Sequence, residues 1–364
     1  MRRNDGVPVL DRAAYGPSGA PSGWACWGHD VAVTTLQRAA RHGPRHAYIV
    51  GGPEHVGKTT LALAFALALM CPDRDARGGA CGQCATCRRI IRGTHPDVSN
   101  FDLARQALED KGSSKHTALT IQTVRTITSS LTLRPLERPW RVVVIDDVET
   151  MQSAAQEAFL KTLEEPPPYA VIILLVTDPE VLLSTVRSRC QVVQLQRVAT
   201  SHIAECLHAA GVEHSVADEL AALSEGLPGW GFRAANDPEL RETRAEMQRH
   251  ASRWIANSTY DRVVMAVQAA DAFGRDRSGS FELLDILAGM WRFIMLRQIV
   301  ASSQETERTS DALTPAAVAH VRIEDLVTAV KSVQICQSDL LSNVRPRLAF
   351  ESMVLDWPTV NSAG

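Results

Sequence analysis

Short apolar runs recur in the first half of the chain, and each run predicts a buried strand. They lie at residues 47–50, 142–145, 171–176 and 191–195. The segments among them that predict helices are residues 29–42, 59–70 and 154–163. Strands that are continuously apolar and alternate with helices are typical of a parallel sheet covered on both faces. This part of the chain therefore predicts an α/β domain.

The pattern changes after residue 197, where the strand signals fade. Residues 200–260 and 261–357 have helical patterns, with breaks at residues 226–229 (GLPG) and 275–280. Residues 1–20 are rich in Gly, Pro, Arg and Asp without any period, and we interpret them as a mobile tail. The expected organisation is a tail at 1–20, an α/β domain at 21–197, a small helical domain at 198–260 and a larger helical domain at 261–364.

Composition places the chain among ordinary globular proteins. Its 364 residues suggest two or three domains, at roughly 150 residues each. The net charge is −3, which excludes a uniformly basic protein that coats nucleic acid. The longest apolar run, residues 61–70, would cover about half a bilayer, and no apolar core follows the N-terminal arginines. We therefore expect a cytoplasmic protein without a membrane helix or a signal peptide.

Residues 52–59 (GPEHVGKT) fit the phosphate-binding pattern G-x-x-x-x-G-K-[ST], with a predicted strand before them and a predicted helix after them. The glycines let backbone N–H groups close around phosphate oxygens, and the helix N-terminus adds positive potential. Lys58 is expected to reach the β- and γ-phosphates and Thr59 to bind Mg²⁺, so ATP with Mg²⁺ is the expected ligand. The candidate nucleotide-binding residues are Gly52, Gly57, Lys58, Thr59, Thr60 and, from a later strand, Asp146.

Two acidic residues follow the strand predicted at 142–145. Asp146 stands where enzymes with this loop place a second group that holds the metal ion. Many of these ATPases have Glu next, which polarises the attacking water, whereas this chain has Asp147. The side chain of Asp147 is one methylene shorter and reaches less far toward that water. An alternative role for Asp147 is to cap the turn after the strand.

Four of the eight cysteines lie close together in the sequence, with the spacing C-x9-C-x2-C-x2-C. Four thiolates on tight turns satisfy tetrahedral Zn²⁺ and leave no open position for catalysis. We therefore expect a structural zinc module over residues 71–96. The alternatives are an iron–sulfur cluster, a disulfide pair or unliganded cysteines. The candidate ligands are Cys71, Cys81, Cys84 and Cys87.

Two further motifs, residues 160–167 (LKTLEEPP) and 188–190 (SRC), follow the acidic pair. Together with the phosphate loop, the cysteines after it and residues 95–97 (HPD), they resemble the bacterial DNA polymerase III clamp-loader subunits of the AAA+ class. The resemblance covers about residues 24–357, and the LKTLEEPP and SRC motifs are highly specific to clamp loaders. It implies a AAA+ P-loop domain with a zinc module, then a small helical lid domain and a C-terminal helical collar domain.

The same resemblance implies roles for individual residues. Arg189 of the SRC motif would act on the nucleotide of a neighbouring subunit, as an arginine finger in trans. Thr177 ends the third predicted strand at the family's first sensor position, where a purely structural hydroxyl fits equally well. Gly229 stands where the motor subunits gamma and tau carry a phosphate-sensing Arg. That difference, Asp147 and the similarity of residues 341–351 to the delta-prime collar favour a delta-prime type of subunit with little ATP hydrolysis of its own.

The partners that the resemblance implies are the gamma/tau and delta subunits in a heteropentamer, the sliding clamp and, through the complex, primed DNA, with no membrane. One alternative is a gamma/tau-like active motor ATPase. Another is a zinc- and ATP-binding DNA-binding regulator, against which the net charge and the lack of a helix-turn-helix signal argue. A metalloenzyme is disfavoured because four Cys ligands close the coordination shell.

Overall fold

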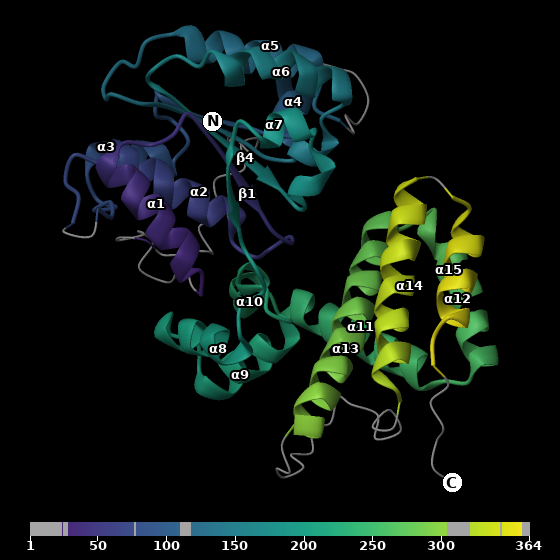
Figure 1. Cartoon of the computed structure of the whole chain (residues 1–364). Helices are drawn as coiled ribbons and strands as arrows, with labels where there is room; N and C mark the ends of the chain where they lie inside the picture. The colour runs from purple at the N-terminus through teal and green to yellow at the C-terminus, as the bar shows by residue number, and fades with distance from the viewer. Residues whose placement is uncertain are drawn as a thin grey trace, which may run out of the picture. The chain divides into compact units, whose positions relative to one another are not determined.

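The computed structural model describes residues 24, 28–75, 78–109, 118–303, 321–342 and 344–358 (Figure 1). The chain divides into two compact units, Met1–Pro238 and Glu239–Gly364. The tail expected at residues 1–20 lies outside the described residues. Among the helices of the described ranges, none is both long and apolar enough to cross a membrane.

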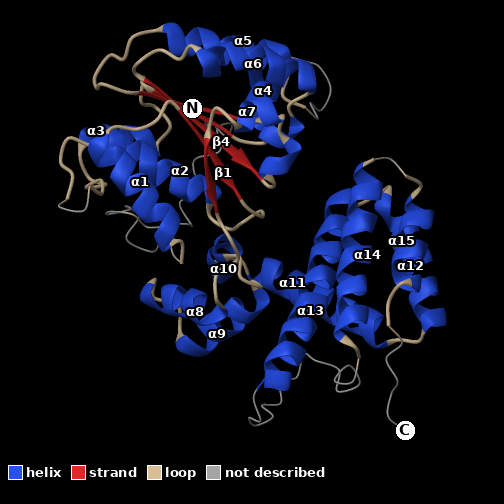
Figure 2. Ribbon diagram, in the orientation of Figure 1, coloured by secondary structure: helices blue, strands red, loops and turns tan. Residues whose placement is uncertain are grey.

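A five-stranded parallel sheet forms the centre of the first unit (Figure 2). Its strands are β1 (Ala47–Gly51), β2 (Val98–Phe101), β3 (Arg141–Ile145), β4 (Ala170–Val176) and β5 (Gln191–Gln194). Their order is β2-β3-β4-β1-β5. β1, β3 and β4 are buried along their whole length, which explains their nearly continuous apolar sequences. The register pairs Gly51 with Val176 and Ile145 with Leu174, so the carboxyl ends of these three strands meet at one edge.

Helices cover both faces of this sheet. One face shares a hydrophobic core with α5 (Ile121–Thr132) and α6 (Ser153–Glu164). On the other face, Phe65 of α2 (Lys58–Met70) meets Tyr48 of β1 edge-on, with 5.0 Å between the ring centroids. The remaining helices in this part are α1 (Asp30–His42), α3 (Ala85–Ile91), α4 (Leu103–Glu109), α7 (Ser184–Arg187) and the short 3₁₀ helices η2 (Val148–Thr150) and η3 (Pro179–Val181).

The predicted α/β fold with a parallel sheet is confirmed, and all four predicted strands are present. β2 is a fifth strand that the pattern does not predict. It lies at the edge of the sheet, and Phe101 is its only fully buried residue. A half-covered edge strand does not need a continuous apolar run, so its sequence carries little signal.

Three helices after β5 form a small helical domain within the first unit: α8 (Thr200–Ala209), α9 (His214–Leu223) and α10 (Pro228–Ala235). The turn before α10 is held against the segment that leaves the sheet. Val198 N donates to Gly226 O at 2.9 Å, and Arg197 Nη1 donates to Glu225 O at 2.6 Å. These bonds fix the start of α10 relative to the sheet.

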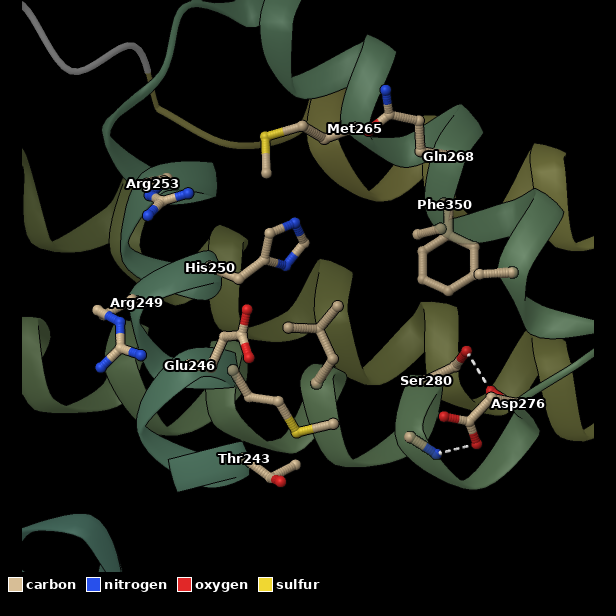
Figure 3. A pocket seen from close by; sticks show the side chains of 15 residues that line it. Thr243, Glu246, Arg249, His250, Arg253, Met265, Gln268, Asp276, Ser280 and Phe350 are labelled. Carbon is tan, nitrogen blue, oxygen red and sulfur yellow. Dashed lines mark hydrogen bonds between the residues drawn. The ribbon is translucent and has the colours of Figure 1, made fainter. Parts of the chain in front are cut away.

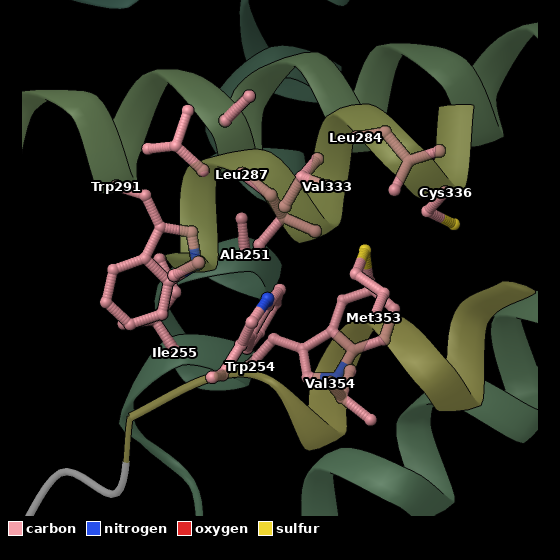
Figure 4. Close-up of a cluster of buried hydrophobic side chains, with 14 of the residues drawn as sticks. Ala251, Trp254, Ile255, Leu284, Leu287, Trp291, Val333, Cys336, Met353 and Val354 are labelled. Atoms are coloured by element: carbon pink, nitrogen blue, oxygen red, sulfur yellow. The ribbon is translucent and has the colours of Figure 1, made fainter. Parts of the chain in front are cut away.

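The second unit is helical and consists of α11 (Pro238–Ala256), α12 (Thr259–Phe273), α13 (Arg277–Ser303), α14 (Ile323–Leu341) and α15 (Pro346–Leu355). Its core is built around aromatic side chains (Figure 4). Trp254 lies 6.4 Å from Phe350 and 5.9 Å from Trp357 between ring centroids. Because Trp254 belongs to α11, this helix packs with the second unit, although the sequence placed a boundary near residue 260. Helical periodicity does not reveal which neighbour a helix will pack against.

The second unit also carries an open groove of about 620 Å³ (Figure 3). The ring of His250 from α11 points into it, and Met265 of α12 and Phe350 of α15 line it. None of the residues expected to carry chemistry lines this groove. The candidate site is therefore confined to the first unit.

Candidate nucleotide site, cysteine cluster and arginine motif

The phosphate loop connects the buried end of β1 to the N-terminus of α2. Gly52 N donates to Val176 O of β4 at 3.1 Å, which holds the loop against the sheet edge. Gly52 has φ 150, and a Cβ there would lie 2.8 Å from Leu195 O. Gly57, directly before α2, has φ 112. Side chains are strained or excluded at both positions, so the shape of the loop requires the two glycines of the motif.

The Lys58 ammonium lies inside this loop and donates to Gly52 O at 2.8 Å and to Pro53 O at 3.0 Å. Burial lowers the pKa of Lys58, while Asp146 raises it most among the neighbouring carboxylates. The loop thus combines a partly buried cation with the N-terminus of a 13-residue helix, whose first turn also holds Thr59 and Thr60. This donor set fits the phosphate groups of a nucleotide.

Asp146 lies opposite the start of α2, as the sequence predicts. Thr59 Oγ1 donates to Asp146 Oδ2 at 3.4 Å, across 87 residues of sequence. Burial raises the pKa of Asp146, while the N–H of Asp147, which donates to Asp146 Oδ1 at 2.9 Å, lowers it. A hydroxyl and a carboxylate in this arrangement fit a magnesium ion bound together with phosphates.

Asp147 and Glu149 extend from the same turn in different directions. Asp147 has the left-handed φ 55, and its Oδ2 accepts from Leu103 N at 3.3 Å, at the start of α4. Glu149 Oε1 accepts from Thr177 N at 3.3 Å, at the end of β4. The sequence does not single out Glu149, because its approach to Thr177 depends on the 3₁₀ turn after β3 and on the neighbouring strand.

The lid helix α10 begins directly against the phosphate loop. Gly229 N donates to His55 O at 2.8 Å, and a Cβ on Gly229 would lie 2.7 Å from the same oxygen. His55 itself has the left-handed φ 58. Residue 229 therefore contributes only backbone atoms to the contact between α10 and the phosphate loop. Arg233, one turn further along α10, is exposed.

The four cysteines come together between two helices. Cys71 ends α2, and Cys84 is the N-cap of α3. All four Sγ atoms lie within 4.8 Å of one another, and the Cys71 and Cys81 Sγ atoms are 3.6 Å apart. Tetrahedral zinc with bonds of about 2.3 Å would place its sulfurs about 3.8 Å apart. None of these cysteines forms a disulfide, and the cluster fits a tetrahedral metal ion.

Backbone N–H groups support these sulfurs in sequence. Cys81 N donates to Cys71 Sγ, Cys84 N to Cys81 Sγ and Cys87 N to Cys84 Sγ, each at 3.4 Å. Hydrogen bonds of this kind favour the thiolate form that a metal requires. These N–H groups thus surround the position that an ion would take.

Arg189 lies on the surface after α7. The sequence predicts one helix over 181–188, whereas the structure has η3 and the short α7 in this region. The Arg189 guanidinium donates to Glu164 Oε1 at 2.6 Å and to Thr185 O at 2.9 Å. Its side chain keeps 35% of its surface exposed. The SRC and LKTLEEPP motifs therefore contact each other through this pair. The hydrogen bonds of the Arg189 guanidinium go to Glu164, Thr185 and Ser188, none of which belongs to the phosphate loop.

Comparison with known proteins agrees with these features. Residues 28–199 match the model of a protein family described as DNA polymerase III, delta subunit. Over 206 residues the chain is 34% identical to DNA polymerase III subunit delta' of Pseudomonas aeruginosa, and the match covers 56% of this chain and 59% of that protein. Over about half of its length, the chain is thus similar to subunits of DNA polymerase III.

The chain is also similar to subunits of other kinds. It is 32% identical over 177 residues to DNA polymerase III subunit tau of Bacillus subtilis, covering 48% of this chain and 29% of that protein. A crystal structure of a DNA polymerase III gamma subunit-related protein from Thermotoga maritima is 18% identical, with a TM-score of 0.39 and coverage of 88% of this chain and 96% of that one. The matches to delta' and tau span less than two thirds of either relative.

Proposed function

We propose that this chain is a delta-prime-like subunit of the DNA polymerase III clamp loader. In this role it assembles in the cytoplasm with gamma/tau and delta subunits and takes part in ATP-dependent loading of the sliding clamp on primed DNA. The observation that carries the proposal is the contact between Gly229 and His55. The family's motor subunits place a phosphate-sensing Arg where this chain has a glycine packed against the loop.

The chain's own nucleotide site is proposed to bind ATP with Mg²⁺ and to hydrolyse it slowly. Lys58 and the backbone of the loop would hold the phosphates, and Thr59 with Asp146 would hold the metal ion. ATP supplies the phosphoryl group when bound. Slow hydrolysis follows from the missing Arg at position 229 and from Asp147, whose carboxylate is engaged by Leu103 N.

Arg189 is proposed to act on a neighbouring subunit's nucleotide. Its guanidinium is on the surface and forms an ion pair with Glu164, whose side chain is exposed. A more highly charged anion can replace Glu164 as the partner of this guanidinium. A phosphoryl group in the next subunit is such an anion, and a guanidinium beside it stabilises the charge that develops during transfer. Thr177 is proposed to serve its own site, since it ends β4 beside the loop.

The cysteine cluster is proposed to hold a structural Zn²⁺. Four sulfurs complete a tetrahedral shell, so the ion would have no open position for substrate. Its effect would be to tie the end of α2 to the start of α3. This module follows the nucleotide-binding helix directly but shares no ligand with the nucleotide site.

A gamma/tau-like motor is the second candidate, favoured by the intact loop and by the contact between Thr59 and Asp146. Purification with gamma/tau and delta subunits, followed by ATPase assays of the isolated chain, separates the two. A delta-prime-like subunit joins the complex and turns over little ATP alone. Robust turnover alone that is lost in Asp147→Asn would identify a motor. Tight sequence-specific DNA binding without partners would instead identify the zinc- and ATP-binding regulator.

A further inference from the structure

The strand order determines which carboxylate after β3 approaches the phosphate loop. β3 lies between β2 and β4, and β1, which leads into the loop, lies beyond β4. At the carboxyl edge of the sheet, a side chain that turns toward β2 moves away from the loop. A side chain that turns toward β4 moves closer to it.

Asp147 turns toward β2. Its carboxylate accepts from Leu103 N at 3.3 Å, and Leu103 begins the helix that follows β2. The left-handed backbone of Asp147 also begins the 3₁₀ turn η2. The carboxylate of this residue is therefore engaged at the start of α4, on the β2 side of β3.

Glu149 turns toward β4. Its Oε1 accepts from Thr177 N at 3.3 Å, and the preceding carbonyl, Val176 O, accepts from Gly52 N of the phosphate loop at 3.1 Å. The carboxylate is thus joined to the loop through Val176, the last residue of β4, and Thr177, which follows it. The pKa of Lys58 agrees with this geometry: burial lowers it, and among the carboxylates that raise it Asp146 ranks first and Glu149 second, ahead of Glu54 and Asp147.

We propose that Glu149, rather than Asp147, is the carboxylate that faces the terminal phosphate of a bound nucleoside triphosphate and sets the preference between triphosphate and diphosphate. This inference rests on the proposed nucleotide binding at Lys58. A carboxylate in this position repels the γ-phosphate, a group that a diphosphate lacks. It therefore weakens the binding of ATP more than that of ADP.

Two isosteric variants of the full chain, Glu149→Gln and Asp147→Asn, test the assignment. Each removes one negative charge and keeps an oxygen that accepts from Thr177 N or Leu103 N. Calorimetry with ATP·Mg²⁺ and ADP·Mg²⁺ gives the ratio of the two affinities. We expect Glu149→Gln to raise the ATP-to-ADP affinity ratio on the order of fivefold. We expect Asp147→Asn to change it by less than about twofold, because that carboxylate faces away from the loop.

The outcomes separate this inference from the proposed function. An unchanged ratio in Glu149→Gln, or a larger shift in Asp147→Asn, overturns the assignment while nucleotide binding stands. No binding of either nucleotide by the unmutated chain overturns both. Thermal unfolding checks that the variants are folded. Glu149→Ala, which removes the charge together with the acceptor, provides a second measurement and should shift the ratio in the same direction.

Discussion

Lys58 and Asp146 are two partly buried charged groups at the start of α2. Burial lowers the pKa of Lys58 and raises that of Asp146, so desolvation disfavours the charged form of both. The ammonium is bonded only to carbonyl groups of its own loop in the contacts described for it. Phosphate oxygens for the lysine and a metal ion for the aspartate would each offset part of this desolvation.

Lys58→Ala is therefore expected to weaken ATP·Mg²⁺ binding at least about tenfold, since it removes a cation that faces the phosphates. Titration calorimetry measures the change. Lys331→Ala, which removes an exposed lysine of α14 in the second unit, is the matched control and should bind normally. Equal affinity in the Lys58 variant and the control would show that the loop does not bind phosphates in the proposed way.

Helix α2 ends, and helix α3 begins, at the cysteine cluster. Cys71 follows the last turn of α2, and Cys84 precedes the first turn of α3, where its Sγ accepts from Cys87 N. The described residues between them, 72–75 and 78–83, form no helix or strand, so a bound ion would supply much of their order. The sheet and α5 pack in a separate core that includes none of the four cysteines.

Cys84→Ser is expected to lose the stoichiometric zinc of the unmutated chain and to open the segment around α3, while the sheet remains folded. Elemental analysis measures the metal, and hydrogen exchange locates the opening. Cys206→Ser changes a buried cysteine of α8 outside the cluster and should keep its zinc. Iron in place of zinc, or no metal in the unmutated chain, would contradict the proposed module.

The contact between α10 and the phosphate loop leaves no room for a side chain at Gly229. Gly229→Ala is expected to lower the free energy of unfolding of the first unit by about 1–3 kcal/mol, the usual cost of overpacking, because the new Cβ would lie 2.7 Å from His55 O. Gly274→Ala is the control, since a Cβ there meets nothing within 4 Å. Urea unfolding compares the two. Equal stabilities would mean that the lid does not rest on the loop.

Arg189 is the residue proposed to act beyond this chain, in a larger assembly. Its bond to Glu164 joins two motifs that are 25 residues apart, but both side chains are partly exposed, so the pair contributes less than about 1 kcal/mol to stability. The fold therefore does not require this arginine. A role in catalysis would appear only when a neighbouring nucleotide is present.

Arg189→Ala is expected to fold, to join its partners and to reduce the ATPase of the reconstituted complex. An arginine finger raises the rate of hydrolysis on the order of 10³-fold or more at the one site that it contacts. The total ATP turnover of the complex should therefore fall only in part. Clamp loading should fall further if the sites act in sequence. Arg187→Ala, which removes a neighbouring arginine paired with Glu180, is the control. Unmutated rates in the Arg189 variant would make Ser188-Arg189-Cys190 a structural motif.

Much of the sheet could be predicted from the sequence. Strands buried on both faces must be apolar throughout, and β1, β3 and β4 show this pattern, whereas edge strand β2 does not. The contacts of the second unit could not be predicted in the same way. α11 has helical periodicity that suits either neighbour, and only the packing of Trp254 assigns it to the second unit.

The sequence by itself determined the residues that had to lie together in the loop and the cysteine cluster. Glycines, Lys58 and the four cysteines are close in the chain, so local geometry and ligand chemistry restrict their arrangement. The tertiary structure alone decided the roles that depend on distant segments. Asp147 and Glu149 are two residues apart, yet Asp147 accepts from Leu103 N and Glu149 accepts from Thr177 N. The strand order places these two donors on opposite sides of β3. A local pattern contains no information on which strand lies next to which, and for that reason Glu149 emerged only from the fold.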